Sequence, residues 1–128
     1  QAALDRRLVI RGPSSGVRNF ITMTDVCLGL EFLVTNLQER VSPLICNLGD
    51  KTKTIGDIAS AIKSIYLKEK GIDLEIIELS NDRSKTQYLD FRSSVLADIG
   101  YQWSSNFKEE LIELVKFCEF EFSARNAN

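Results

Sequence analysis

The chain has 128 residues, a length that fits one domain and that buries roughly two thirds of the surface of the unfolded chain. Apolar residues make up 44% of it and charged residues 27%, and no apolar run approaches the ~20 residues of a membrane span. These values indicate a soluble globular domain with no membrane partner. The chain has no histidine, so we expect neither a serine hydrolase, which needs that base, nor a metal site.

The net charge of −2 is spread unevenly along the chain. Residues 1–18 and 51–70 carry +3 each, whereas residues 19–50 carry −3 and residues 71–128 carry −5. A basic N-terminal part on an otherwise acidic domain suits a small anionic ligand better than nucleic acid, because a long polyanion would be repelled by the acidic remainder. We therefore expect no nucleic-acid partner.

The three cysteines, Cys27, Cys46 and Cys118, are odd in number, widely spaced and set among apolar neighbours. This pattern predicts buried free thiols in a reducing compartment, which is the cytoplasm. The sequence starts at Gln1 rather than at Met, so we also expect that further sequence precedes it.

The N-terminal quarter of the chain contains two short apolar runs joined by a turn. Residues 1–7 favour the end of a helix, and residues 8–10 favour a short strand. Residues 12–16 consist of Gly, Pro and Ser, which predicts a turn, and residues 17–23 alternate as a second strand does. Arg18 lies where this second strand begins.

Four helices, two further strands and one short extended segment are expected after this turn. Thr22 can cap a helix whose core-facing stripe would be Val26, Leu30, Leu33 and Leu37. The apolar run at residues 44–46 predicts a buried strand. The next helix would start near Thr54 and stop at Gly71. A strand at residues 74–79, a short extended segment at 88–90, a brief helix at 92–98 and a last helix from Asn106 follow, with the last stripe formed by Phe107, Leu111, Leu114, Val115 and Cys118.

Two motifs carry potential chemistry. Tyr66 and Lys70 match the Y-x-x-x-K spacing with which short-chain dehydrogenases lower the pKa of a catalytic tyrosine, but they close a helix that no nucleotide-binding turn precedes, so we interpret the match as chance. Arg18 follows a flexible turn, and a guanidinium is well shaped to bind phosphate oxygens. A structural salt bridge from Arg18 to Asp25 or Asp90 is the alternative.

The order of features resembles one known family. Residues 8–12, 16–21 and 25–26 resemble the segment that opens the substrate-binding lobe of extended short-chain dehydrogenases, the NAD-dependent sugar-nucleotide epimerases and dehydratases. Residues 46–49 resemble the Y-N-x-G turn of that family, and the segments at residues 54–62, 88–90 and 99–109 resemble its later landmarks. Pro13 and Ser14 depart from the pattern, since the family usually has Asp-Gly there.

The resemblance implies which residues bind substrate. Arg18 matches the arginine that binds the diphosphate of the sugar nucleotide, and the strand backbone around Val9 and Ile10 matches the part that lies along the base. Arg83 corresponds to a second family arginine, in the loop before the final helices. The resemblance implies that the catalytic residues and the NAD- or NADP-binding domain belong to sequence outside this chain, so that no catalytic residue, no metal and no cofactor is expected within it.

We therefore expect residues 1–128 to form a single α/β lobe, a small mixed α/β unit of short strands and three to four helices that lacks a Rossmann domain. It would be the C-terminal, sugar-nucleotide-binding part of an NAD(P)-dependent epimerase, dehydratase or reductase, and it would not catalyse a reaction alone. The alternative is a non-catalytic interaction or regulatory module that keeps the same fold.

Overall fold

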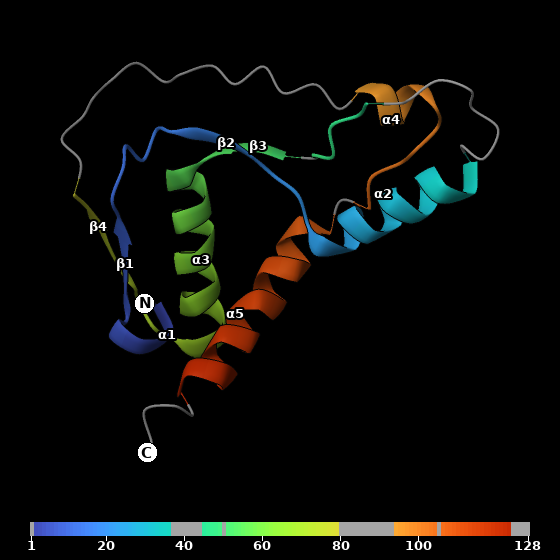
Figure 1. Ribbon diagram of the computed structural model, residues 1–128. Coiled ribbons are helices and arrows are strands. Elements are labelled where there is room, and N and C mark those ends of the chain that lie inside the picture. Colours follow the sequence, from blue (N-terminus) through green and yellow to red (C-terminus); the bar gives the residue numbers. More distant parts are fainter. Residues whose placement is uncertain (1, 37–44, 50, 80–93, 105, 124–128) are drawn as a thin grey trace.

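The computed structural model describes residues 2–36, 45–49, 51–79, 94–104 and 106–123. The elements of these residues follow in the order α1 (Ala2–Asp5), β1 (Arg7–Ile10), β2 (Val17–Phe20), α2 (Met23–Asn36), β3 (Lys51–Thr54), α3 (Ile55–Lys70), β4 (Glu75–Glu78), α4 (Ser94–Asp98) and α5 (Phe107–Ser123) (Figure 1). The small mixed α/β class is confirmed. The described residues hold five helices rather than three to four, because α1 and α4 are short turns of 4 and 5 residues.

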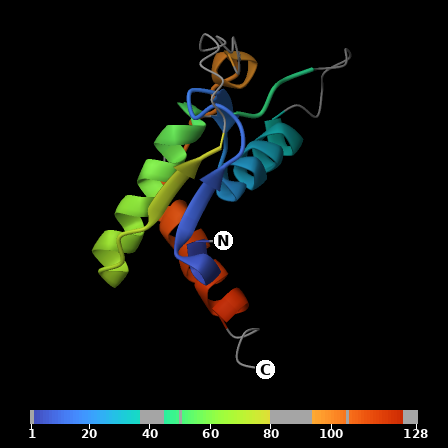
Figure 2. The ribbon, with the colours of Figure 1, turned by 90° about the vertical axis from the view of Figure 1, so that its left-hand side faces the viewer.

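The strands form two separate pairs. β1 runs parallel to β4, with Arg7 opposite Glu75, and β2 runs antiparallel to β3, with Val17 opposite Thr54. In Figure 2, β1 and β4 lie next to each other with α3 along the outside of β4. The turn between β1 and β2 therefore links the two strand pairs.

The ends of α3 follow directly from the sequence. The Thr54 hydroxyl accepts a hydrogen bond from the Asp57 N–H, and the Asp57 carboxylate accepts one from the Thr54 N–H, which is a reciprocal capping box. At the other end Gly71 adopts φ 66°, a left-handed conformation that glycine reaches without the steric cost of a Cβ. The predicted start and stop of this helix are confirmed.

The apolar core lies between α3, β4 and α5. It consists of five buried residues: Ile65, Tyr66, Leu74, Leu111 and Val115. α1 packs on α5 at the edge of this core. The prediction for Leu114 was wrong, because its side chain is 55% exposed, and of the predicted α5 stripe only Leu111 and Val115 are buried.

In α2 only part of the predicted stripe contacts the protein, since Val26 and Leu33 are partly buried. Asp25 and Gly29 are its buried residues, whereas Leu30 is 51% exposed, and Leu37 lies outside the described residues. A Cβ on Gly29 would lie 3.0 Å from Leu48 Cδ2, so the absence of a side chain allows this close approach. Close packing at a glycine and hydrogen bonding at Asp25 set the orientation of the helix, and neither contributes to an apolar stripe.

The predicted strand at residues 44–46 was also wrong. Ile45 is 88% exposed, residues 45–49 form no regular element, and Leu44 lies outside the described residues. The strand of this region is β3, whose sequence Lys-Thr-Lys-Thr contains no apolar residue. It pairs with β2 and leaves both alternating sets of side chains partly in contact with solvent, which the search for apolar runs could not detect.

The cysteines are free, as predicted, but they are not buried. Cys27 is exposed, and Cys46 and Cys118 are partly exposed. No helix in the described part of the chain combines the length and the apolar character needed to cross a bilayer.

Leu74 tests this core, since it is 0% exposed and joins β4 to α3. We expect Leu74→Ala to lower the free energy of unfolding by about 2–4 kcal/mol, because it removes buried methyl groups and leaves a cavity. Urea denaturation followed by circular dichroism measures the change. Leu79→Ala is the control, because Leu79 is 62% exposed, and it should change stability by no more than about 0.5 kcal/mol. Equal effects of the two substitutions would contradict the assigned core.

Candidate functional site

The turn between β1 and β2 is fixed by backbone hydrogen bonds to two other elements. The Ser14 N–H donates to Glu78 Oε1 at 2.7 Å, the Ser14 carbonyl accepts from the Gly56 N–H at 2.8 Å, and the Gly16 carbonyl accepts from the Ile55 N–H at 3.0 Å. The turn is therefore held between the end of β4 and the start of α3. The hydrogen bonds from Ser14 hold the pKa of the Glu78 carboxyl below its usual value.

Arg18 lies two residues after this turn, in β2, with its side chain exposed. Its Nη1 donates to the Val17 carbonyl at 2.7 Å, and none of the described carboxylates forms an ion pair with it. The alternative prediction, a salt bridge between Arg18 and Asp25, is wrong, because the Asp25 carboxylate accepts hydrogen bonds from Thr22 and Ser104 instead. Asp90, the other alternative partner, lies outside the described residues.

Asp25 is instead a buried structural centre. Its side chain is 0% exposed, Oδ2 accepts from the Thr22 hydroxyl at 2.9 Å, and Oδ1 accepts from the Ser104 N–H at 2.8 Å. Its carbonyl accepts from the Tyr101 hydroxyl at 3.2 Å. Burial raises the pKa of Asp25, but the hydrogen bonds from Ser104 and Thr22 and the charge of Lys51 outweigh it, so the pKa lies below its usual value.

Val9 and Ile10, the two strand residues expected to lie along the nucleotide base, have different surroundings. Leu79 N–H donates to the Ile10 carbonyl at 2.9 Å, so the backbone of Ile10 faces β4, and its side chain is buried. Successive residues of a strand direct their backbone groups to opposite edges, so Val9 faces the other edge, with which no described strand pairs. The backbone groups of Val9 therefore take no part in the hydrogen bonds between β1 and β4, and the side chain of Ile10 belongs to the core. Arg83 lies outside the described residues.

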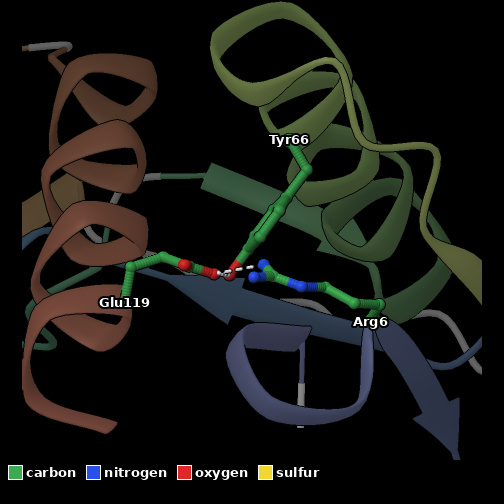
Figure 3. A network of polar contacts seen from close by, with 3 residues as sticks. All are labelled: Arg6, Tyr66 and Glu119. Atoms are coloured by element: carbon green, nitrogen blue, oxygen red, sulfur yellow. Dashed lines mark hydrogen bonds and ion pairs between the residues drawn. The ribbon is translucent and has the colours of Figure 1, made fainter. Parts of the chain in front are cut away.

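Tyr66 and Lys70 do not form a catalytic pair. Tyr66 is 1% exposed, and its hydroxyl donates to Glu119 Oε1 at 2.6 Å, while Arg6 Nη1 donates to the same oxygen at 3.0 Å (Figure 3). Burial and the Glu119 carboxylate raise the pKa of Tyr66, which is the opposite of what a catalytic phenol requires. The interpretation of this motif as chance is confirmed, and its tyrosine joins α3 to α5.

The described residues place two cations beside one anchored turn. They contain no group of three or more histidine, cysteine, aspartate or glutamate residues that could hold a metal ion. What they do bring together is an anchored turn, the exposed guanidinium of Arg18 and, directly opposite it in β3, Lys53. Lysine and threonine alternate at residues 51–54, which is the sequence signal for Lys53, but a pattern of apolar residues does not reveal it.

Comparison with known proteins shows which fold the chain shares with solved structures. No family model matches the sequence, and neither does any curated protein. Three solved structures match over most of the chain. RMD from Pseudomonas aeruginosa, solved with NADPH, matches with a TM-score of 0.70 and 17% identity over 91% of this chain and 37% of its own.

The other two structures are similar in extent. UDP-N-acetylglucosamine 4-epimerase from Methanobrevibacter ruminantium, solved with UDP-N-acetylmuramic acid, matches with a TM-score of 0.65 and 22% identity over 89% of this chain and 34% of its own. dTDP-glucose 4,6-dehydratase from Bacillus anthracis, solved with NAD, matches with a TM-score of 0.66 and 20% identity over 94% of this chain and 37% of its own. The chain adopts the fold of one part of these enzymes. It spans little more than a third of the length of each.

Asp25 predicts a dependence of stability on pH. Its pKa is lower in the folded chain than in the unfolded one, so its contribution is complete above the unfolded value of about 3.9 and is lost as pH falls through the folded value. We expect Asp25→Asn to lower the free energy of unfolding at pH 7 by about 1–3 kcal/mol. Below about pH 4 the free energies of unfolding of the variant and the wild type should differ less. Urea denaturation from pH 7 to pH 3 measures both. Asp73→Asn, at an exposed carboxylate, is the control and should show neither effect.

Tyr66 predicts the opposite dependence at high pH. Its folded pKa is raised, so the stability that its hydroxyl provides is complete below the unfolded value of about 10 and is lost as pH rises through the folded value. Tyr66→Phe should lower the free energy of unfolding by about 1 kcal/mol at pH 8, with a smaller difference above about pH 10. Urea denaturation at the two pH values tests this. A tyrosine with a lowered pKa would instead make the stability difference between wild type and Tyr66→Phe grow as pH rises toward 10.

Proposed function

We propose that this chain is the substrate-binding part of an NAD(P)-dependent enzyme that acts on a nucleotide-diphosphate sugar, and that Arg18 binds the diphosphate. The observation that carries the proposal is an exposed guanidinium without a carboxylate partner among the described residues, placed on a strand that follows a rigidly anchored turn. A guanidinium binds phosphate oxygens in pairs, and a fixed strand holds it in position without much loss of entropy on binding.

The fold likeness supports the choice of substrate class. Two of the similar proteins are named for UDP- and dTDP-sugars, and two were solved with NADPH or NAD. Epimerase, dehydratase and reductase activities all fit this proposal. On this view the NAD(P)-binding domain lies in sequence that precedes these residues, catalysis belongs to that domain, and the whole protein works in the cytoplasm.

The outer face of α2 supports contact with another domain. Met23, Cys27, Leu30 and Val34 follow one another at helical spacing, and all four are exposed, with exposed fractions of 72% for Met23 and 71% for Val34. Apolar side chains gathered on an exposed helix face usually mark a surface that another protein or domain covers. We propose that the NAD(P)-binding domain covers this face.

The same face favours a second candidate, a non-catalytic module that uses α2 to bind another protein. The two candidates differ in whether the chain binds nucleotide. Only the substrate-binding part needs the cation at Arg18.

Isothermal titration calorimetry of the parent protein, which on this proposal includes the NAD(P)-binding domain, with a UDP-, a GDP- and a dTDP-sugar, with and without NAD, tests the proposal. We expect at least one of the sugars to bind, and Arg18→Gln to weaken that binding by about 1.5–3 kcal/mol, which is about 10- to 150-fold, because a charge-assisted hydrogen bond is lost. Arg7→Gln is the matched control, since Arg7 lies at the far end of β1 next to Asp5, and it should leave the affinity unchanged. Absence of binding to all three sugars would refute the proposal and favour the protein-binding module.

A further inference from the structure

Two cations lie directly opposite each other on the β2–β3 ribbon. Arg18 is the register partner of Lys53. Side chains of directly opposed residues in an antiparallel pair point to the same face, with Cβ atoms about 4.5–5.5 Å apart, and like charges in this arrangement repel. The chain therefore places an unfavourable pair of charges next to the anchored turn.

The described carboxylates do not neutralise this pair. Lys53 acts on the carboxylate of Asp57, whose Oδ2 accepts from the Thr54 N–H at 3.0 Å as part of the capping box. The pKa of Asp57 is lowered mainly by its hydrogen bonds with Thr54, and the charge of Lys53 contributes least to this shift. Lys53 and Asp57 form no ion pair in the described ranges. Lys51, two residues before Lys53, acts on a different carboxylate, that of the buried Asp25.

Lys53 also borders a cavity. An open cavity of about 240 Å³ lies between α3 and the start of α5, and Lys53, Lys68, Lys108 and Phe107 contribute to its wall. Phe107 in turn packs edge-on against Phe20 of β2, with ring centroids 6.4 Å apart. Arg18 and Phe20 are two residues apart in β2, so their side chains lie on the same face of the strand. Because Phe20 contacts Phe107, which lines the cavity, the ribbon face that carries the two cations is the face next to this cavity.

We propose that Lys53 is a second diphosphate-binding residue, which acts together with Arg18 from the neighbouring strand. This inference rests on the proposed function, because it assigns to the same ligand a further contact. A diphosphate carries charge on both phosphate groups, so two cations on one rigid ribbon face match it better than they match a monophosphate. The mutual repulsion of the empty pair is then relieved when the ligand binds.

The test compares diphosphates with monophosphates. Calorimetry is carried out on the parent protein with UDP, dTDP and GDP and with UMP, dTMP and GMP, for the wild type, Arg18→Gln, Lys53→Gln and the double variant. Lys68→Gln is the matched control, because Lys68 lines the same cavity but lies on α3, away from the ribbon. Thermal unfolding of each free variant at low salt is measured alongside.

We expect Lys53→Gln to weaken binding of the preferred diphosphate by about tenfold and of its monophosphate by a smaller factor. The double variant should lose less than the product of the two single losses, since both cations contact one ligand. Free Lys53→Gln should unfold at the same temperature as the wild type or higher, because a repulsive pair is removed. Lys68→Gln should bind as the wild type does.

Three results would overturn the inference, and they differ in what else they affect. If Arg18→Gln weakens diphosphate binding and Lys53→Gln does not, the proposed function stands and the role of Lys53 is wrong. If Lys53→Gln lowers the unfolding temperature and weakens diphosphate and monophosphate equally, Lys53 serves the structure around Asp57. If the wild-type parent protein binds none of the six nucleotides, the proposed function fails and the inference fails with it.

Discussion

The backbone hydrogen bonds of residues 14 and 16 are the constraint on which the rest of the candidate site depends. They fasten the turn to Glu78 at the end of β4 and to the first N–H groups of α3. The first N–H groups of a helix have no partner within the helix, so the turn satisfies groups that would otherwise need water or a side chain. The position of β2, and with it the position of Arg18 and Lys53, follows from this connection.

Polar side chains complete the assembly where the strand pairs are too small to do so. Two-stranded pairs bury little apolar surface and are marginal by themselves. Asp25 ties the start of α2 to the segment before α5, and Glu119 ties α5 to Tyr66 of α3 and to Arg6 before β1. Each of these carboxylates accepts two or more hydrogen bonds from the chain, and these bonds offset the cost of removing its charge from water.

Much of the fold could be predicted from local sequence signals. The threonine cap and the glycine stop define α3, and apolar runs with turn residues between them locate β1, β2 and β4. Three features could not be predicted in this way. β3 has no apolar residue, the buried face of α2 is set by Gly29 and a buried carboxylate, and the partner of Arg18 across the ribbon depends on register. Each of these depends on contacts between segments distant in sequence, which periodicity within one segment does not reveal.

The parallel pairing of β1 with β4 has a consequence for how the chain folds. The first strand finds its partner only after two helices and two other strands have been added, so the pairing closes a long loop and carries a correspondingly large entropy loss. α3 and β4 are neighbours in the chain and contact each other, so they can assemble locally first. We therefore expect β1 and the turn after it to join late, and the β2–β3 ribbon to be completed only when the remainder of the lobe has already folded.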